Sequence, residues 1–568
     1  MSQLDWVVLA SALLLMVVYG VWRGGRSTDT RGFLLGGREM RWGTVALSIM
    51  ATQASAITFL STPGQAYADG MRFVQFYLGL PIAMIVLSIT AVPLYYRLKI
   101  FTAYEFLEGR FDLKTRALTA FLFLIQRGLA AGLTIFAPSL ILSVILGWDM
   151  RVTILVIGGL VIVYTTSGGT RAVSRTQVLQ AVIILAGMGA AFVVLLTSLP
   201  ADVSLLDAVR VAGKSGRLNA IDLSFNLNDR YTLWSGLIGG AFLALSYFGT
   251  DQSQVQRYLS GQSVTQNRLG LLFNGMAKVP MQFAILFLGA MVFAFYQFKA
   301  PPIFFDPVET ARVRASSDGV RFGELESRYG EAVGARERRA RELLKALKSG
   351  SAREEAQRAF AEAGARADAV RGEAIALMRS GDPRANPSDT NYVFLSFVVK
   401  YLPAGLVGLV LAAVFAASMS ASSAELNALA STTVVDVYRR LLRPGAGEGH
   451  YVLVSRLATV LWGAFAITFA EQAGRLGSLV EAVNILGSLF YGTILGIFLA
   501  GFYVRRVSGT AVFAAAIAAE ALVIGCFLFT GVSFLWYNVV GCFAVIVLAL
   551  LFEPWVGARA PHHETASA

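Results

Sequence analysis

The sequence predicts an all-α polytopic membrane protein with 13 transmembrane helices. Of its 568 residues, 56% are hydrophobic and 15% are charged, whereas a soluble domain has about 25% charged residues. The mean hydropathy is +0.61, and apolar windows of about 20 residues, enough for one helix across a bilayer, recur along nearly the whole chain. The segment 300–390 departs from this pattern, so we expect lipid to surround most of the remaining chain.

The apolar windows define the predicted spans in order. They cover residues 6–22, 43–64, 73–95, 117–146, 152–170, 177–199, 232–254, 269–298, 404–437, 451–471, 478–502, 510–530 and 533–552. The first window begins beside acidic Asp5 and is followed by basic residues. A signal peptide has the opposite charge order, so we expect this helix to be retained.

Basic residues predict the orientation of the chain. Arg23, Arg26 and Arg31 follow the first span and Arg97 and Lys99 follow the third, whereas loops after even-numbered spans carry few basic residues. Cytoplasmic loops are enriched in Lys and Arg, so we expect an outer N-terminus, a cytoplasmic C-terminus and a location in the plasma or inner membrane. The same loops account for the net charge of +12 and give no indication of a nucleic-acid partner.

The charged segment 300–390 predicts an extracellular or periplasmic helical hairpin. Its apolar residues recur at steps of three and four, which is typical of one helical stripe: Phe360, Ala363, Ala367, Val370, Ala374 and Leu377. We favour a hairpin packed on itself; the alternatives are a docking site for an extracellular partner and a lid over the solute entrance. The predicted units are a transmembrane domain 1–299 (spans 1–8), the insertion 300–390, a second transmembrane part 391–556 (spans 9–13) and a cytoplasmic tail 557–568.

Two polar segments inside the apolar spans indicate transport. The run Ala51–Phe59 carries Gln53 and several hydroxyls, and irregular polar backbone at membrane depth is tolerated only where it lines a cavity or is buried in protein. It therefore predicts a broken helix that holds an ion and a solute. The second segment, 416–423, holds four serines; such a run suits either a helix-packing face or oxygen ligands for Na⁺, and the two segments together favour the ion site.

Ionisable residues inside spans are expensive and indicate function. Arg127, Asp251, Lys278 and Glu425 are the main cases, although Asp251 and Lys278 could also lie near helix ends with their charges in water. No paired carboxylates, metal-ligand spacing or Ser–His arrangement converges in these helices, so the sequence predicts neither catalytic residues nor an enzyme.

Six ordered blocks resemble one family, the sodium:solute symporters of the solute carrier 5 type. They are GFLLGGREMRWG (32–43), ALSIMATQASAITFLSTPGQAYADG (46–70), YRLKIFTAYEFLEGRF (96–111), TSGGTRAVSRTQVLQ (166–180), SYFGTDQSQVQRYLSG (246–261) and LPAGLVGLVLAAVFAASMSASSAELN (402–427). The stretch IFAPSLILSVILGWD (135–149) is most similar to the iodide, monocarboxylate and multivitamin branch. The resemblance implies a LeuT-like inverted repeat of two five-helix bundles, spans 2–6 and 7–11, with spans 2 and 7 broken.

The resemblance also implies a sodium site. Its ligands fall on the carbonyls of Ala51, Ala54 and Ala417 and on the Ser420 hydroxyl. Relatives usually have a second hydroxyl at the position of Ala421, so one ligand is absent in this chain. Some relatives hold a second sodium with an Asp where this chain has Gln177, which predicts one coupling ion rather than two.

The solute pocket of the family maps onto eight positions. They are Gln53, Ser55, Thr58, Phe76, Tyr77, Tyr247, Lys278 and Asn484. Lys278 or Arg127 could neutralise a carboxylate, unless these side chains face the cytoplasm. Thr58 stands where sugar and iodide carriers have Gln, which makes a hexose or iodide less favoured.

These observations predict a Na⁺-coupled symporter that imports a small organic solute by alternating access. A monocarboxylate or similar organic anion is the first choice. The alternatives are a sodium-coupled sugar or sugar-acid symporter and a proton-coupled transporter that uses Glu425 or Asp251.

Overall fold

The computed structural model describes residues 1–24, 40–53, 55–382, 386–474 and 476–556. Within these ranges the fold is helical, with one isolated parallel bridge between Met40 and Gly261. Ala54 and the predicted tail 557–568 lie outside the described residues.

The elements of the first half begin with α1 (Gln3–Gly24), α3 (Trp42–Gln53), α4 (Ala56–Asp69), the 3₁₀ helix η2 (Met71–Tyr77), α5 (Leu80–Ile89), α6 (Ala91–Leu98), α7 (Glu105–Arg110), α8 (Leu113–Leu146), α9 (Met150–Thr197), α10 (Leu205–Lys214), the π-helical turn η3 (Ser235–Gly239), α11 (Gly240–Gly249), α12 (Gln252–Tyr258) and α13 (Val264–Phe298). The second half consists of α14 (Pro307–Arg314), α15 (Gly319–Ser349), α16 (Arg353–Gly381), α17 (Thr390–Tyr401), α18 (Leu406–Thr432), the π-helical η4 (Thr433–Leu442), α19 (Glu448–Ala473), α20 (Leu479–Tyr503), α21 (Gly509–Phe529) and α22 (Phe534–Val556).

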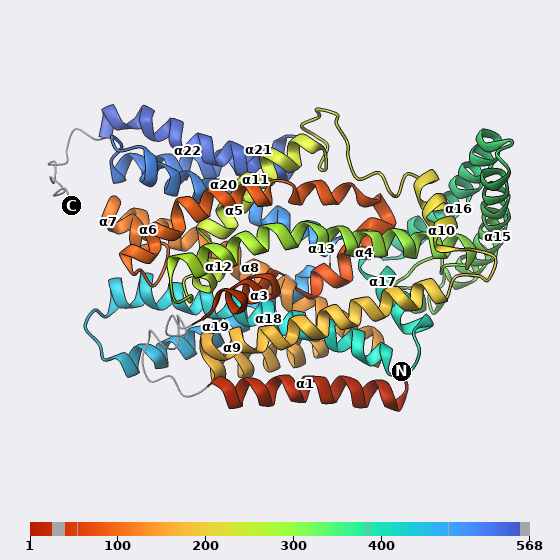
Figure 1. The fold of residues 1–568 in the computed structure, drawn as a ribbon, viewed down its shortest axis with the longest axis horizontal. Coiled ribbons are helices and arrows are strands. Elements are labelled where there is room, and N and C mark those ends of the chain that lie inside the picture. Colours follow the sequence, from red (N-terminus) through yellow and green to blue (C-terminus); the bar gives the residue numbers. More distant parts are fainter. Residues whose placement is uncertain (25–39, 54, 383–385, 475, 557–568) are drawn as a thin grey trace.

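The described chain contains nine helices that are long and apolar enough to cross a membrane, and the pair α3–α4 makes a tenth when it is taken as one bent span. The long helices lie side by side along one axis, and α15 and α16 project at one end (Figure 1). Large apolar side chains on the outer helices are exposed, among them Ile89, Leu160 and Phe529. Apolar side chains on the outside of the helix bundle are what a lipid solvent requires, so the chain is a multi-pass membrane protein.

Two helices are interrupted at the positions where the sequence predicts breaks. α3 ends at Gln53 and α4 begins at Ala56, while α11 ends at Gly249 and α12 begins at Gln252. At the second break, Asp251 accepts a hydrogen bond from the Ser253 backbone N–H at 2.8 Å and so caps α12. The first interruption lies beside the cavity described below, and Tyr247 and Phe248 of α11, just before the second, line the same cavity.

The insertion forms an antiparallel pair of helices, α15 and α16, but it does not pack on itself alone. The predicted stripe of α16 is buried, and its Phe360 shares an apolar core with Val203, Val211 and Phe298, which lie outside the insertion. Lys348 at the end of α15 forms a 2.8 Å ion pair with Asp207 of α10. The sequence pattern could not reveal these contacts, because they join the pair of helices to segments that lie far away in the chain.

Candidate functional site

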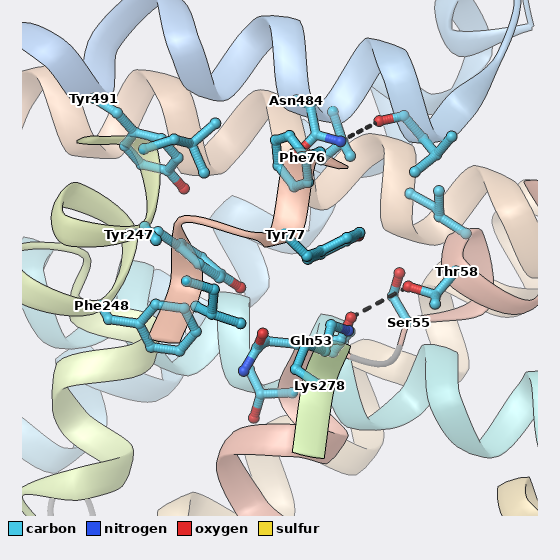
Figure 2. Close-up of a pocket in the computed structure, with 18 of the residues that line it drawn as sticks. Gln53, Ser55, Thr58, Phe76, Tyr77, Tyr247, Phe248, Lys278, Asn484 and Tyr491 are labelled. Atoms are coloured by element: carbon cyan, nitrogen blue, oxygen red, sulfur yellow. Dashed lines mark hydrogen bonds between the residues drawn. The ribbon is translucent and has the colours of Figure 1, made fainter. Parts of the chain in front are cut away.

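The broken helices border a cavity of about 130 Å³ in the middle of the bundle. All eight residues that the sequence analysis assigned to the solute pocket line it: Gln53, Ser55, Thr58, Phe76, Tyr77, Tyr247, Lys278 and Asn484 (Figure 2). The lining also includes Gln126, Arg127, Phe248, Glu425 and Tyr491. The structure therefore brings together residues from α3, α4, η2, α8, α11, α13, α18 and α20.

The aromatic wall is positioned by close contact between η2 and the helix that begins at η3. A Cβ on Gly236 would lie 2.0 Å from the Gln75 carbonyl oxygen, and one on Gly240 would lie 2.5 Å from the Phe76 carbonyl oxygen. Only glycine allows this approach of two backbones. The ring centroids of Phe76 and Tyr77 are 4.7 Å apart in an edge-on arrangement, which is a favourable geometry for aromatic pairs.

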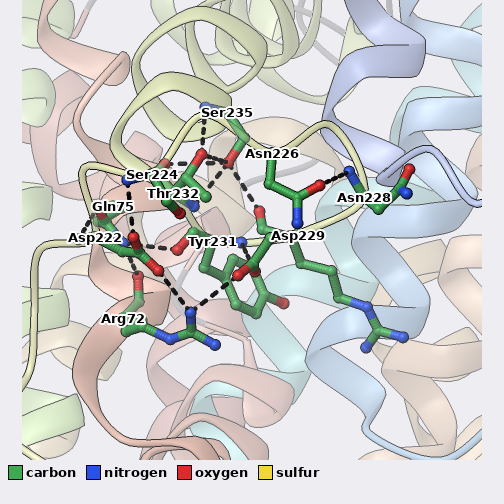
Figure 3. A network of polar contacts seen from close by, with 11 residues as sticks. Arg72, Gln75, Asp222, Ser224, Asn226, Asn228, Asp229, Tyr231, Thr232 and Ser235 are labelled. Atoms are coloured by element: carbon green, nitrogen blue, oxygen red, sulfur yellow. Dashed lines mark hydrogen bonds and ion pairs between the residues drawn. The ribbon is translucent and has the colours of Figure 1, made fainter.

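A polar network at the N-terminal end of η2 holds this helix in place (Figure 3). Arg72 forms ion pairs of 2.9 Å with Asp222 and 3.1 Å with Asp229. The buried Gln75 donates to the Tyr231 carbonyl at 2.8 Å and accepts from the Asp222 backbone N–H at 2.9 Å. The loop between α10 and η3 thus fixes the segment that carries Phe76 and Tyr77.

The polar lining comes from the break between α3 and α4 and from the first turns of α20. Gln53 Nε2 donates to Asn274 Oδ1 at 2.9 Å, and the Thr58 hydroxyl donates to the Gln53 carbonyl at 3.3 Å. Asn484 donates to the Val480 carbonyl at 2.7 Å. These contacts orient each side chain toward the cavity while the amide oxygens of Gln53 and Asn484 keep acceptor capacity.

The two cations that the sequence offered as carboxylate partners have different surroundings. Arg127 forms ion pairs with Asp251 and Glu425, and its distance to the Glu425 carboxylate is 3.0 Å. It also donates a hydrogen bond to the Tyr491 hydroxyl. Lys278 is 2% exposed and its ammonium lies 5.7 Å from the centre of the Tyr77 ring. It forms no ion pair with any residue that the structure describes. Both side chains face the cavity, but Arg127 is already compensated and Lys278 is not.

Two of the predicted sodium ligands, Ser420 and Ala51, are in contact where α3 and α18 pack together. Ser420 Oγ donates to the Ala51 carbonyl oxygen at 3.1 Å, and Ala51, Ala417 and Ser420 are all buried. Oxygen ligands of Ca²⁺, an ion of similar size, lie about 2.3–2.6 Å from the metal, so two oxygens this far apart can contact one ion. The fourth predicted ligand, Ala54, lies outside the described residues.

Gln177 lies beside the same oxygens. It accepts from the Ser48 hydroxyl at 2.5 Å and donates to the Thr52 hydroxyl at 3.0 Å and to the Ser420 carbonyl at 3.5 Å. The site accordingly has a neutral amide at this position. Hard, uncharged oxygens from a broken helix and a serine are chemically suited to a monovalent cation.

Sequence reasoning missed several residues of the cavity, chiefly Tyr491, Phe248, Thr134 and Val480. Tyr491 lies in an apolar span and gives no local signal, because a tyrosine there is equally compatible with a position at the membrane surface. Its role depends on contacts with Arg127 and Asp251, both more than 200 residues away in the chain.

Comparison with known proteins places this architecture in a family. The model of the "Sodium:solute symporter family" matches residues 33–316 and 379–519. The human sodium-coupled monocarboxylate transporter 1 is 27% identical over 503 residues, covering 88% of this chain and 69% of the relative. The human sodium/iodide cotransporter is 26% identical over 504 residues, with coverage of 88% and 66%.

A solved structure of a Na⁺-coupled sialic acid symporter has the same fold, with a TM-score of 0.75 at 22% identity over 99% of this chain and 100% of that chain. The two segments matched by the family model flank most of α15 and α16, which lie outside the matched residues. The family predicted from the six blocks and the branch predicted from residues 135–149 are confirmed, and the relatives are transporters rather than enzymes. The chain belongs to the sodium:solute symporter family, whose coupling ion is Na⁺.

Proposed function

We propose that this symporter uses Na⁺ to import a small monocarboxylate by alternating access. The observation that carries the choice of solute is Lys278, a buried cation in the cavity that has no carboxylate partner among the described residues. A buried charge without a partner is costly and indicates a functional role when it lies inside the membrane. A carboxylate on the solute would supply the missing charge, and a relative named for monocarboxylates supports this choice.

The size of the cavity supports a short solute. It measures about 130 Å³, whereas an engineered cavity of about 150 Å³ holds benzene. A solute with on the order of six heavy atoms therefore fits this space. The rings of Phe76, Tyr77, Tyr247 and Phe248 would contact its apolar part.

We further propose that one Na⁺ binds to the carbonyls of Ala51, Ala54 and Ala417 and to the Ser420 hydroxyl. The 3.1 Å contact between Ser420 and Ala51 supports this assignment. The neutral Gln177 beside these oxygens supports a single coupling ion, because it supplies no carboxylate for a second one.

The finer topology belongs to the same proposal. Three shorter apolar helices, Gln3–Met16, Met150–Thr166 and Ser235–Gly249, would raise the ten candidates to 13 spans in an inverted repeat. The N-terminus lies at the end of the bundle that carries α15 and α16, and α22 ends at the opposite side (Figure 1). This arrangement supports an outer N-terminus, an extracellular or periplasmic insertion and a cytoplasmic C-terminus in the plasma or inner membrane.

Substitution of Ser420 by alanine is expected to raise the Na⁺ concentration for half-maximal uptake by roughly tenfold, because an ion contact with a hydroxyl is lost. The maximal rate at saturating Na⁺ should change much less. Ser418→Ala is the matched control, since the Ser418 hydroxyl on the same helix donates to the Thr134 carbonyl at 3.3 Å. An equal effect of both substitutions would remove Ser420 from the ion site.

The direct test of the proposed function is thermal stability of the purified protein in Na⁺ and in choline, with short carboxylates, vitamins and sugars. A solute that binds the native state raises the melting temperature by mass action. We expect short monocarboxylates to do so in Na⁺ and not in choline. Stabilisation by sugars, or equal stabilisation in choline, would contradict the proposal.

A further inference from the structure

The buried ion cluster at one wall of the cavity has more negative than positive groups. Arg127 of α8 pairs with Asp251, which precedes α12, and with Glu425 of α18. The exposed fractions of these three residues are 3%, 1% and 7%. One guanidinium therefore faces two carboxyl groups away from water, and the cluster has a formal charge of −1 when both are ionised.

The two carboxyl groups are not equivalent. Besides Arg127, Asp251 accepts from the Ser253 backbone N–H at 2.8 Å, the Ser253 hydroxyl at 2.7 Å and the Tyr491 hydroxyl at 3.0 Å. Glu425 accepts from Arg127 through Oε1 alone. Its Oε2 is buried and has no hydrogen-bond partner. Thr134 lies within hydrogen-bonding reach of the Glu425 carboxyl group, but its hydroxyl donates to the Ala130 carbonyl at 3.1 Å in this structure.

A second orphaned acceptor lies on the same cavity wall. Gln126 is 1% exposed, and its Oε1 has no partner although its Nε2 donates to Tyr491 at 3.3 Å. Two buried acceptors without donors are costly, and a carboxylate without compensation more so. The cluster thus lacks one positive charge and one donor, and Glu425 Oε2 is the atom at which both are missing.

The missing charge fits a proton better than a metal ion. Glu425 Oε2 is itself buried, although the Glu425 side chain lines the cavity. A hydrated cation or an ammonium group on a solute needs space beside this oxygen, whereas a proton does not. A neutral carboxyl also becomes a donor through its O–H.

Glu425 is also close to the proposed sodium site along the helix. Ala417, Ala421 and Glu425 are spaced four residues apart on α18 and share one face, and Ser420 lies about 7.5 Å from Glu425 along the helix axis, at 1.5 Å per residue. The separation through space is larger than this rise, so at an effective dielectric constant of about 20 an ionised Glu425 strengthens Na⁺ binding by at most roughly 30-fold. By linkage, bound Na⁺ weakens proton binding by the same factor.

We propose that Glu425 is a proton-binding site that releases its proton to the cavity water when Na⁺ binds at the level of Ser420. This inference rests on the sodium site of the proposed function. The exchange conserves charge, because the proton that leaves Glu425 Oε2 is replaced by one Na⁺. Asp251 accepts from four donors whereas Glu425 Oε2 has none, so the structure distinguishes between the two proton carriers that the sequence left open.

Other titratable groups face the same cavity wall as Glu425, and each of them can contribute to a pH dependence of Na⁺ binding. Around Glu425 they are Arg127 of α8, Asp251 at the start of α12, Tyr247 of α11, Tyr491 of α20 and Lys278 of α13. α12 also packs on α18 and carries the buried Arg257. α3 and α9 present the neutral side chains of Thr52 and Gln177 to α18.

The test is a titration of Na⁺ binding without solute, in which the melting temperature is the readout of binding. The titration is repeated at several pH values from about pH 5 to about pH 9. In the parent protein, the Na⁺ concentration for half-maximal stabilisation should fall as the pH rises, by up to tenfold per pH unit and by at most roughly 30-fold in total. Addition of NaCl, but not choline chloride, to weakly buffered protein should release protons to a pH-sensitive dye. Glu425→Gln, which keeps the shape of the side chain, should abolish both the release and the pH dependence.

Glu520→Gln is the matched control, because Glu520 of α21 is a buried carboxyl that does not line the cavity. This variant should behave like the parent. A Na⁺ affinity that stays constant with pH in the parent, or a pH dependence that survives Glu425→Gln, overturns the proposal. Absence of any Na⁺ response at any pH would instead contradict the proposed sodium site on which it rests.

Discussion

Substitution of Lys278 by methionine is expected to abolish uptake of a monocarboxylate at ordinary concentrations. Methionine retains most of the apolar stem but removes the ammonium that would pair with the solute. Loss of one partner of a buried charge pair costs about 2–5 kcal/mol in binding, so the half-saturating solute concentration should rise by roughly 30-fold or more. This concentration is measured from the uptake of a labelled short carboxylate into proteoliposomes that carry a Na⁺ gradient.

The same variant should not lose stability. Lys278 has no ion-pair partner among the described side chains, and replacing an uncompensated buried charge by an apolar group removes its desolvation cost. We therefore expect an unchanged or higher melting temperature without solute. Lys278→Arg, which keeps the charge, should retain more uptake than Lys278→Met. Equal uptake by Lys278→Met and the parent would show that the solute is not held by this cation.

Substitution of Arg127 by methionine is expected to have the opposite effect on stability. It leaves the carboxyl groups of Asp251 and Glu425 buried without their common partner. Removing one member of a buried ion pair typically costs about 3–5 kcal/mol, so the melting temperature in detergent should fall by many degrees.

The control for Arg127→Met removes the excess negative charge as well. Combining it with Asp251→Asn and Glu425→Gln should restore most of the lost stability, because no unpaired charge remains. Retention of the parental melting temperature by Arg127→Met alone would mean that water reaches the cluster and compensates the carboxylates. The contrast between Lys278 and Arg127 separates a cation available to the solute from one that holds helices together.

Local composition was sufficient to predict a large part of this molecule. The apolar windows predict helices in lipid, and the polar run at Gln53 predicts the interruption between α3 and α4. Ordered blocks of residues predict the family, which the comparisons confirm. The ligand and solute roles of the individual residues stay predictions, although the structure gathers the eight solute candidates around one cavity.

The partners of buried charges could not be predicted in this way. Arg127 and Glu425 are 298 residues apart in the chain and Arg127 and Asp251 are 124 apart. Nothing near either carboxylate in the sequence shows that both face one guanidinium. The sequence therefore presented Arg127 and Lys278 as equal candidates for binding a carboxylate.

The sequence by itself determined that the chain spans a membrane, that its helices are interrupted within the bilayer and that its relatives are sodium-coupled transporters. Hydrophobic spans and helix breaks depend on residues that are neighbours in the sequence, so they can be predicted from the local sequence pattern. Only the tertiary structure decided that Lys278 has no ion-pair partner among the described residues, that Glu425 keeps an unpaired oxygen and that α15 and α16 pack on distant segments. Electrostatic compensation and side-chain packing are set by groups that approach one another through space, and that proximity exists only once the helices are assembled.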